Sequence, residues 1–340
     1  MRLFFMFAIL CGFYSEACGK FSLDIDMKLK TLNKPALKTI KSEDGDIIDC
    51  VDIYKQHAFD HPALRNHKIQ MKPSVEFGSK KTIIPNNGSS KPITSQIWSK
   101  SGNCPIRTIP EAVVLAVGFN FIGAQSDINV WNPPRVEAGD YSSAQIWLLA
   151  GLSDKFETIE AGWVVNPRVF GDSRTRLFTY WTKDSYNSTG CINLLCAGFV
   201  QTTTEFALGT AIEPDPNSGN WWLTCQDIVL GYWPGALFDD LKHSATAVQW
   251  GGEVYSPNVR KKPHTKTPMG SGEWASYIWS KACFHTNIRI KDYSLQIKYP
   301  EYLSEYSDEY DCYSTKLHRE TYMSEPYFYF GGPGQNRLCP

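Results

Sequence analysis

The segment Glu157-Thr-Ile-Glu-Ala-Gly-Trp-Val-Val165 indicates a β-strand, because it follows the two-residue period of that structure. In that period Glu160 shares one face with Gly162 and Val164, whereas the apolar residues between them share the other face. Gly162 removes side-chain bulk beside the carboxylate, which would leave room for a substrate. A lone glutamate is unusual on such a face, although the spacing alone also fits an ordinary strand carboxylate.

A second stretch, Val248-Gln-Trp-Gly-Gly-Glu-Val-Tyr255, places another carboxylate, Glu253, in an aromatic strand. Two glycines, Gly251 and Gly252, precede it. Glycine inside a strand marks a close approach of the backbone or a bulge that redirects a side chain. The same glycine pair also fits a strand that only adjusts its twist, so both interpretations stay open at the level of spacing.

Short apolar segments of this kind recur after about residue 111, separated by turns rich in proline and glycine. Many short strands with few helical periods favour an all-β fold, an antiparallel sandwich or barrel. One short helix is expected at residues 234–242, and no repeat of a propeller or solenoid is found. The expected strands are residues 113–117, 128–131, 144–149, 158–165, 176–181, 198–203, 220–224 and 247–255.

The 340 residues carry 34 Lys and Arg against 35 Asp and Glu, a formal net charge of −1. This balance provides no general attraction to nucleic acid or to an anionic membrane, so we expect neither as a partner. Charged residues form 20% and hydrophobic residues 42% of the chain, which is typical of a globular protein. Neither a CxxC pair nor an HExxH motif occurs, so we expect no metal and no cofactor.

The N-terminus has the pattern of a secretory signal peptide. Arg2 is followed by an apolar run at residues 3–13, and small residues lead to an expected cleavage after Gly19. The run is too short to span a bilayer. We therefore expect a secreted protein, outside the cell, in the cell wall or in the vacuole; an unprocessed buried helix is the alternative. The sequons at Asn87 and Asn187 are expected glycosylation sites.

Eight of the ten cysteines lie after the signal peptide. An even number in an exported chain predicts disulfides, although eight cysteines allow 105 pairings. Cys191 and Cys196 would close a tight loop worth about 2 kcal/mol in the chain-entropy model. Cys312 with Cys339 would hold the C-terminal tail, for about 3.5 kcal/mol in the same model. The pairing of the other four stays open: Cys50, Cys104, Cys225 and Cys283.

Several segments combine aromatic residues with glycine or proline in a recognisable order. They include Ile128-Asn-Val-Trp131, Ser143-Ala-Gln-Ile-Trp147, Thr158-Ile-Glu-Ala-Gly-Trp163, Gly190-Cys-Ile-Asn-Leu-Leu-Cys196, Gly219-Asn-Trp-Trp-Leu223, Gly231-Tyr-Trp-Pro234, Gly251-Gly-Glu253 and Met269-Gly-Ser-Gly272. Together they resemble the neprosin family of secreted plant proteins, and residues 48–62 resemble that family's activation peptide. The resemblance covers nearly everything after residue 40, in order.

The resemblance implies a β-sandwich glutamic endopeptidase that is made as a zymogen and cuts after proline. It places the catalytic pair on Glu160 and Glu253, on facing strands, and suggests the amide of Gln145 as a substrate-orienting group. The implied organisation is a signal peptide at 1–19, an activation peptide at 20–105 with a linker near 85–100, and a peptidase domain at 106–340. Expected partners are a peptide or protein substrate and the chain's own pro-region as an intramolecular inhibitor, in a monomer.

Peptide hydrolysis without a metal needs one carboxylate to take a proton from water and another group to protonate the carbonyl oxygen or the leaving nitrogen. Two neighbouring carboxylates repel, so the pair would titrate in two steps and hold one proton across an acidic window. We therefore expect a bell-shaped, acidic pH optimum. Acidification is also expected to loosen the pro-region, through carboxylates such as Glu43, Asp44 and Asp46, and to allow autocleavage.

One departure from the family pattern bears on activity. A strand that the family usually has before Trp221 is expected to be missing near residues 213–219, which would expose a sheet edge or remove a wall of the cleft. A catalytically inactive binding module of the same fold is therefore an alternative function. A glycosidase is another, because two carboxylates and aromatic walls also suit sugar hydrolysis.

Overall fold

The computed structural model describes residues 34–42, 47–74, 120–151, 155–203, 210–214, 217–225, 228–321 and 323–340. The expected signal peptide, the linker, the strand at 113–117, Asn87 and Cys104 lie outside these ranges. Within them, no helix is both long enough and apolar enough to cross a membrane.

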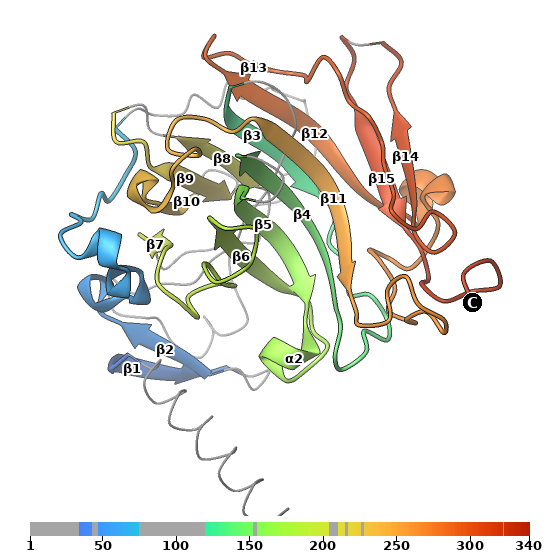
Figure 1. The fold of residues 1–340 in the computed structure, drawn as a ribbon, viewed down its shortest axis with the longest axis horizontal. Helices are drawn as coiled ribbons and strands as arrows, with labels where there is room; N and C mark the ends of the chain where they lie inside the picture. Colours follow the sequence, from blue (N-terminus) through green and yellow to red (C-terminus); the bar gives the residue numbers. More distant parts are fainter. Residues whose placement is uncertain are drawn as a thin grey trace, which may run out of the picture.

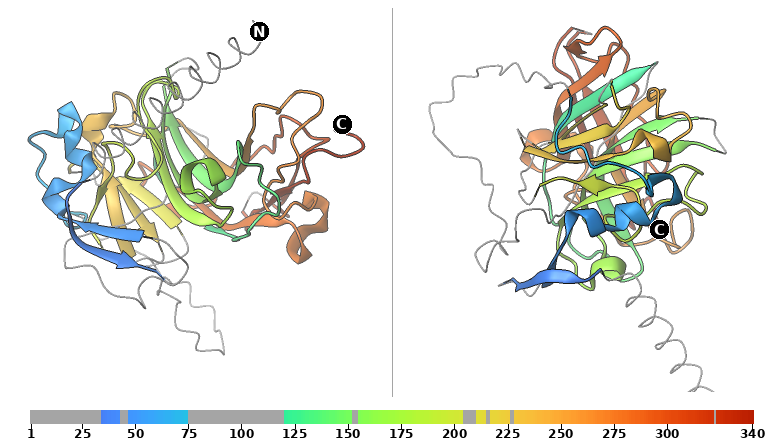
Figure 2. Two further views of the ribbon diagram at one scale, coloured as in Figure 1. Left: turned by 90° about the horizontal axis from the view of Figure 1, so that it is seen from below. Right: turned by 90° about the vertical axis from the view of Figure 1, so that its left-hand side faces the viewer.

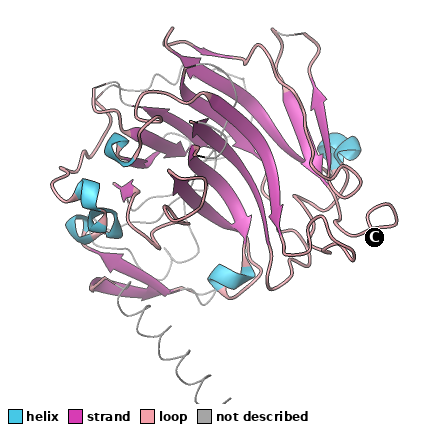
Figure 3. Cartoon of the chain, viewed as in Figure 1, coloured by secondary structure: helices cyan, strands magenta, loops and turns pink. Residues whose placement is uncertain are grey.

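Two antiparallel sheets make up most of the described chain, with only short helical turns between strands (Figures 1 and 3). The four-stranded sheet of the described residues has the order β11–β4–β5–β6, and its strands in chain order are β4 (Tyr141–Ala150), β5 (Glu157–Val165), β6 (Arg176–Thr182) and β11 (Ala247–Tyr255). A short helix, α2 (Pro167–Phe170), joins β5 to β6.

The second sheet, nine-stranded in the described part, has the order β14–β15–β12–β3–β8–β9–β10–β7, with β13 paired to β12. Its strands in chain order are β3 (Phe121–Ile128), β7 (Val200–Gln201), β8 (Thr210–Pro214), β9 (Trp221–Cys225), β10 (Ile228–Trp233), β12 (Cys283–Asp292), β13 (Ile297–Lys298), β14 (Ser314–His318) and β15 (Tyr327–Gly331). Two 3₁₀ turns complete this part, η5 (Gly235–Leu237) and η6 (Ala275–Ser280).

The two sheets share one large apolar core. Alternate residues of the four-stranded sheet point into it, which is why the two-residue period of the sequence predicted these strands. The all-β antiparallel sandwich is thereby confirmed. Fully buried core residues include Ile146, Leu148 and Ile159 from the four-stranded sheet and Trp221, Leu223 and Leu230 from the other.

Most of the expected strands are confirmed. Residues 247–255 coincide with β11, while 144–149, 158–165 and 176–181 fall inside β4, β5 and β6. The strand expected at 128–131 is wrong, because β3 ends at Ile128 and the chain then leaves the sheet towards two prolines, which have no amide to donate. The strand expected at 198–203 is shorter: β7 covers only Val200–Gln201, and Thr202 N adds one backbone hydrogen bond to Leu230 O at 2.9 Å.

The helix expected at 234–242 is also wrong. Only the 3₁₀ turn η5 forms there, and the backbone amides that follow it bind a side chain from another element. The Glu157 carboxylate accepts hydrogen bonds from the amides of Asp239, Asp240 and Leu241, at 2.6, 2.9 and 2.7 Å. Amides engaged in this way do not donate to the preceding turn, so the helix does not continue.

Between Pro214 and Trp221, where a family strand is expected to be missing, none of the described residues 217–220 lies in a strand. Residues Thr210–Pro214 form β8, which pairs with β3 on one side and with β9 on the other. The sheet is therefore continuous at this place, and no edge is exposed between β3 and β9.

The N-terminal described residues pack on the end of the sandwich that carries β7 and β10, away from the C-terminus (Figure 2). They form the hairpin β1 (Ala36–Lys41) and β2 (Ile47–Val51), followed by the 3₁₀ turns η1 (Ile53–Lys55), η2 (His57–Asp60) and η3 (Pro62–Leu64). Leu64 belongs to the main core, and Ala58 packs against Val200, Trp222 and Tyr232. This segment is thus built into the apolar interior of the sandwich.

Both of the disulfides expected from spacing are confirmed, Cys191–Cys196 and Cys312–Cys339, with Cα–Cα distances of 5.9 and 5.3 Å. Cys50 is disulfide-bonded as well. Cys283 is a buried free thiol, so it does not pair with Cys225.

Candidate active site

Glu160 and Glu253 lie on the same face of the four-stranded sheet, on strands that are not neighbours. Glu160 of β5 is opposite Trp147 of the central strand β4, and Glu253 of β11 is opposite Ser143 of that strand. Opposite residues of antiparallel strands point to one face, as do residues two apart along a strand. The expectation of facing strands is therefore corrected, because β4 separates the two glutamates.

Gln145 occupies the row of the sheet between the two glutamates. It is opposite Gly162 of β5 and Gly251 of β11, so neither neighbouring strand contributes a side chain to this row. Its Nε2 donates to Glu160 Oε2 at 3.1 Å. Its Oε1 is buried and has no hydrogen-bond partner among the described residues. An unpaired buried acceptor is uncommon and marks a place where a ligand N–H or a water would bind.

Glu160 is almost fully buried, with 4% of its surface exposed. Its Oε1 accepts a hydrogen bond from Thr158 Oγ1 at 2.8 Å and a short one from the hydroxyl of Tyr186. Both oxygens are therefore engaged, one by two hydroxyls and the other by the Gln145 amide.

Glu253 is only partly buried and has fewer partners. Its Oε1 accepts a hydrogen bond of 2.6 Å from the hydroxyl of Tyr141, whose ring stacks on Tyr255 with centroids 5.4 Å apart. Ser143, directly opposite Glu253, is fully buried, and its Oγ has no partner in the described part of the chain. A second unpaired polar atom thus lies on the face that carries both glutamates.

The two carboxylates differ in how firmly they hold a proton. Burial raises the pKa of Glu160 to about 8, the negative charge of Glu253 adds to the rise, and the hydrogen bonds that Glu160 accepts oppose it. Burial also raises the pKa of Glu253, against the hydrogen bond from Tyr141. Coupled carboxylates lose their protons in separate steps. Glu253, with more of its surface exposed, ionises first, and Glu160 keeps its proton to higher pH.

The glycines of the two strands allow close backbone approach. A Cβ on Gly162 would lie 2.0 Å from the carbonyl oxygen of Ala144, so the glycine lets β4 and β5 come together and does not provide substrate space. A Cβ on Gly252 would lie 2.5 Å from the ring of Phe330. The register of β11 on β4 is continuous, so the alternative of a bulge at the glycine pair is not realised.

Four residues that surround the glutamates were not predicted as partners of the carboxylates. The two-residue period places Thr158 on the face of Glu160, and the same period would place Ser143 on the face of Gln145. Tyr141 begins β4 two residues before Ser143, so the same period puts it on that face, whereas Tyr186 comes from a loop, which has no periodic signal. Asn187, the described sequon, lies exposed in the same loop as Tyr186.

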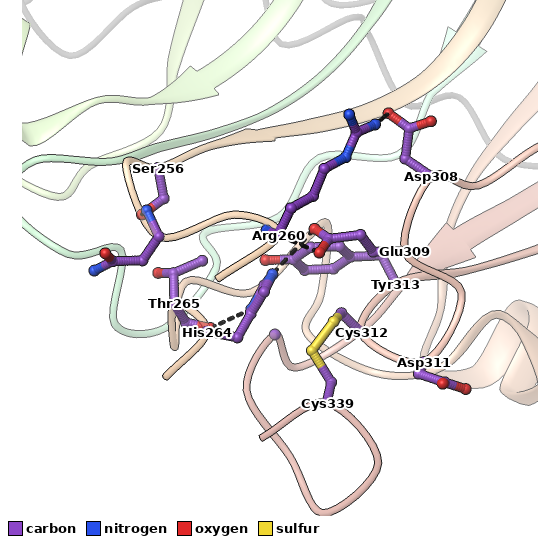
Figure 4. Close-up of polar contacts among 12 residues, drawn as sticks. Ser256, Arg260, His264, Thr265, Asp308, Glu309, Asp311, Cys312, Tyr313 and Cys339 are labelled. Carbon is purple, nitrogen blue, oxygen red and sulfur yellow. Dashed lines mark hydrogen bonds and ion pairs between the residues drawn. A yellow bond between two sulfur atoms is a disulfide. The ribbon is translucent and has the colours of Figure 1, made fainter. Parts of the chain in front are cut away.

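A second cluster, near the C-terminus, looks like a metal site but has no free ligand atoms (Figure 4). The ligand atoms of His264, Cys312 and Cys339 lie within 4.8 Å of one another. The two cysteines are joined in a disulfide, so neither offers a thiolate. The ring nitrogens of His264 contact the carbonyl oxygen of Thr265 at 2.9 Å and Glu309 Oε2 at 3.1 Å. This cluster fastens the C-terminal tail.

A family model of neprosin matches residues 138–333, more than half of the chain, and a model of the neprosin activation peptide matches residues 39–113. The chain belongs to the neprosin family. Both glutamates, Gln145 and Tyr186 lie inside the neprosin match, and β2 with the turns η1 to η3 lies inside the activation-peptide match. A neprosin with an activation peptide is a peptidase-like protein of zymogen type, whose own pro-region acts as the intramolecular inhibitor.

Proposed function

We propose that this neprosin is the secreted zymogen of a glutamic endopeptidase, which hydrolyses peptide bonds after proline with Glu160 and Glu253 as the catalytic pair. The proposal rests on the position of Gln145, which lies on the sheet in the row between the two glutamates. Two electrostatically coupled carboxylates flank an amide whose oxygen is buried and unpaired. This combination provides a proton donor, a proton acceptor and a hydrogen-bond acceptor for a peptide N–H.

The difference in burial assigns the two roles. Glu253, ionised, takes a proton from a water whose oxygen attacks the carbonyl carbon of the substrate, while Glu160 gives its proton to the carbonyl oxygen. In the second step Glu253 returns its proton to the leaving nitrogen and the C–N bond breaks. Glu160 recovers its proton from a hydroxyl of the tetrahedral intermediate, so a new carboxyl group forms and the site is restored. Gln145 Oε1 accepts a backbone N–H of the substrate and orients the chain.

The pro-region is the inhibitor of this site. Its described part is anchored by buried contacts such as Leu64 in the main core, so it has to unfold from the sandwich before it leaves. Incubation of the purified proform at pH 3 and at pH 7 tests self-activation. Conversion to a shorter chain at pH 3 is expected; a full-length, folded chain at both pH values would exclude it.

The decisive experiment is cleavage of an internally quenched, proline-containing peptide between pH 2 and 9 by acid-treated protein. Glu160→Gln and Glu253→Gln are each expected to lower kcat by at least about 10³-fold, because neither amide can exchange the proton. Glu301→Gln is the matched control, since the same change is made on an exposed loop. Full activity in either site variant would reject the catalytic pair.

The same purified protein can be used to test the two alternative functions, an inactive binding module and a glycosidase. The inactive binding module is favoured by the expected loss of a strand, although β8 pairs directly with β3 and β9 and leaves no exposed edge between them. A folded wild type that cleaves no peptide, with or without proline, would return it to first place. A panel of glycan substrates tests the glycosidase, for which sugar cleavage lost in Glu160→Gln is the expected sign.

Secretion and glycan attachment at Asn187 are tested by the mass of the exported chain before and after deglycosylation.

A further inference from the structure

The loop at residues 183–190, between β6 and Cys191, is organised around the carboxylate of Asp184. Its Oδ2 accepts from the backbone amide and the hydroxyl of Ser188, at 3.0 and 2.6 Å. Its Oδ1 accepts from the amide and hydroxyl of Thr189, at 3.1 and 2.6 Å, and from Thr182 Oγ1 at 3.0 Å. A surface loop with this many internal hydrogen bonds holds its side chains in fixed positions.

The same loop places two successive residues in the left-handed region, Ser185 at φ 56° and Tyr186 at φ 63°. Ser185 is fixed to the residue before β5, because its amide donates to Phe156 O at 3.0 Å and its Oγ accepts from Phe156 N at 2.9 Å. The amide of Tyr186 donates to Thr182 Oγ1 at 3.1 Å. Non-glycine residues adopt this conformation where the surroundings hold them in it, often at functional sites.

The strained backbone directs the ring of Tyr186 over Glu160. The ring contacts Phe156 edge-on and Tyr180 at a tilt, with centroids 5.5 and 5.6 Å apart. Its hydroxyl reaches Glu160 Oε1, although 45% of the residue remains exposed. Tyr186 therefore lies between the buried carboxylate and solvent.

The partners of Glu160 are distributed unequally between its oxygens. Oε1 accepts from two hydroxyls, those of Tyr186 and Thr158, whereas Oε2 accepts only from the Gln145 amide. An oxygen that already accepts two donors holds an additional proton less readily than one that accepts a single donor. Oε2 is the oxygen beside Gln145, in the row between the two glutamates.

We propose that Tyr186 is a positioning residue for Glu160: by donating to Oε1 together with Thr158, it keeps the proton of the acid form on Oε2, next to Gln145 and the substrate. This inference rests on the proposed function. Tyr186 does not itself react with the peptide. Its loop fixes which oxygen of Glu160 gives the proton.

The first test is Tyr186→Phe, which keeps the ring and removes the donor. We expect kcat to fall about twofold with little change in KM, because each oxygen then accepts one donor and the proton is shared about equally between them. The alkaline limb of the pH profile is expected to move to higher pH, because a donor to the ionised form of Glu160 has been lost. Tyr180→Phe is the matched control. Tyr180 is opposite Glu160 on β6 and donates no described hydrogen bond to it, so neither change is expected.

A second measurement separates this proposal from the proposed function. The carboxyl ¹³C resonance of Glu160, assigned by its loss in Glu160→Gln, is titrated in wild type, Tyr186→Phe and Tyr180→Phe. A higher pKa in Tyr186→Phe alone supports the positioning role even if the protein cleaves no peptide. Thr158→Val, which removes the other donor to Oε1, is expected to act in the same direction. An unchanged titration and an unchanged pH profile in Tyr186→Phe would overturn the proposal, whatever the wild-type activity.

Discussion

The side-chain amide of Gln56 forms two hydrogen bonds with the backbone of Gln201, 145 positions further along the chain. Gln56 Nε2 donates to Gln201 O at 3.1 Å, and Gln201 N donates to Gln56 Oε1 at 3.0 Å. Gln201 lies on β7, the last strand of its sheet in the described structure. One side chain of the activation peptide thus takes the place of a neighbouring strand and covers an edge that would otherwise expose unpaired backbone groups.

Replacement of Gln56 by alanine is expected to weaken the docking of the activation peptide by about 1–3 kcal/mol, because two backbone groups on β7 lose their partner. Limited proteolysis of the proform at pH 7 measures the effect, with faster cleavage in the 53–74 segment as the expected result. Lys68→Ala, a change at an exposed position of the same segment, is the control. Equal cleavage rates in the two variants would show that the edge contact contributes nothing to docking.

Docking is also expected to depend on pH through the histidines of the activation peptide. Burial lowers the pKa of His57, His61 and His67 below the ordinary value of 6.5. His61 is further lowered by the charge of Lys183, and His57 by Lys34, whereas Asp60 beside His57 acts in the opposite direction.

The direction of this pH effect follows from the linkage between proton binding and docking. A histidine whose pKa is lower in the docked state stabilises docking fully above pH 6.5, and this contribution is lost as the pH falls through the docked-state pKa. The carboxylates expected to respond to acid, Glu43, Asp44 and Asp46, lie outside the described residues. The described contacts instead assign part of the acid response to imidazole groups.

His67→Gln tests this assignment, because the amide keeps a polar contact with the Tyr232 hydroxyl, 2.7 Å from His67 Nε2, and does not titrate. Hydrogen exchange of the 53–70 segment is compared at pH 7.5 and 5.0 in a Glu160→Gln background, which prevents self-cleavage. We expect the His67→Gln variant to lose less hydrogen-exchange protection between pH 7.5 and 5.0 than the protein that retains His67. His243→Gln, at an exposed position outside the segment, should leave the pH dependence unchanged. Identical pH dependence in both variants would assign the acid response elsewhere.

The peptidase activity is expected to decline above pH 8. Glu160 has a pKa of about 8 and must be protonated to act as the acid, while Glu253 must be ionised to act as the base. The profile of kcat/KM against pH is therefore a bell whose alkaline limb reports Glu160 and whose acid limb reports Glu253. An activity that still rises above pH 9 would contradict these roles.

The alternation of side chains was enough to predict β4, β5 and β11, and with them the strands that carry both glutamates. It failed at β12, where the register shifts between Thr286 and Arg289 and Asn287 has φ 51°. This irregularity interrupts the two-residue period, so the strand has no continuous signal in the sequence.

The site itself needed information that alternation does not contain. The position of Gln145 between the glutamates depends on the register of three strands, and a shift of one residue would place it on the other face. Tyr186 depends on a strained loop that is held by Asp184, and its contact with Glu160 crosses from one element to another. The strand pattern singled out both glutamates and the resemblance to the family joined them in one site, whereas the contact of Tyr186 with Glu160 emerged only from the three-dimensional arrangement.

The close approach of β4 and β5 at Gly162 can be tested separately from the chemistry. A Cβ there would lie 2.0 Å from Ala144 O and 2.6 Å from Gln145 Cα, both backbone atoms of the strand that lies between the glutamates. Gly162→Ala is therefore expected to separate the two strands, at a cost of about 3 kcal/mol in the free energy of unfolding.

Urea unfolding measures this cost, and Gly139→Ala is the matched control because a Cβ on Gly139 meets no atom within 4 Å. The Gln145 amide is displaced with its strand and should lose its contact with Glu160. The kcat of the Gly162→Ala variant is therefore expected to fall by more than the loss of folded protein accounts for. Equal stability of the two alanine variants would mean that β4 and β5 lie further apart than in the structure. The position of Gln145 between Glu160 and Glu253 would then be wrong.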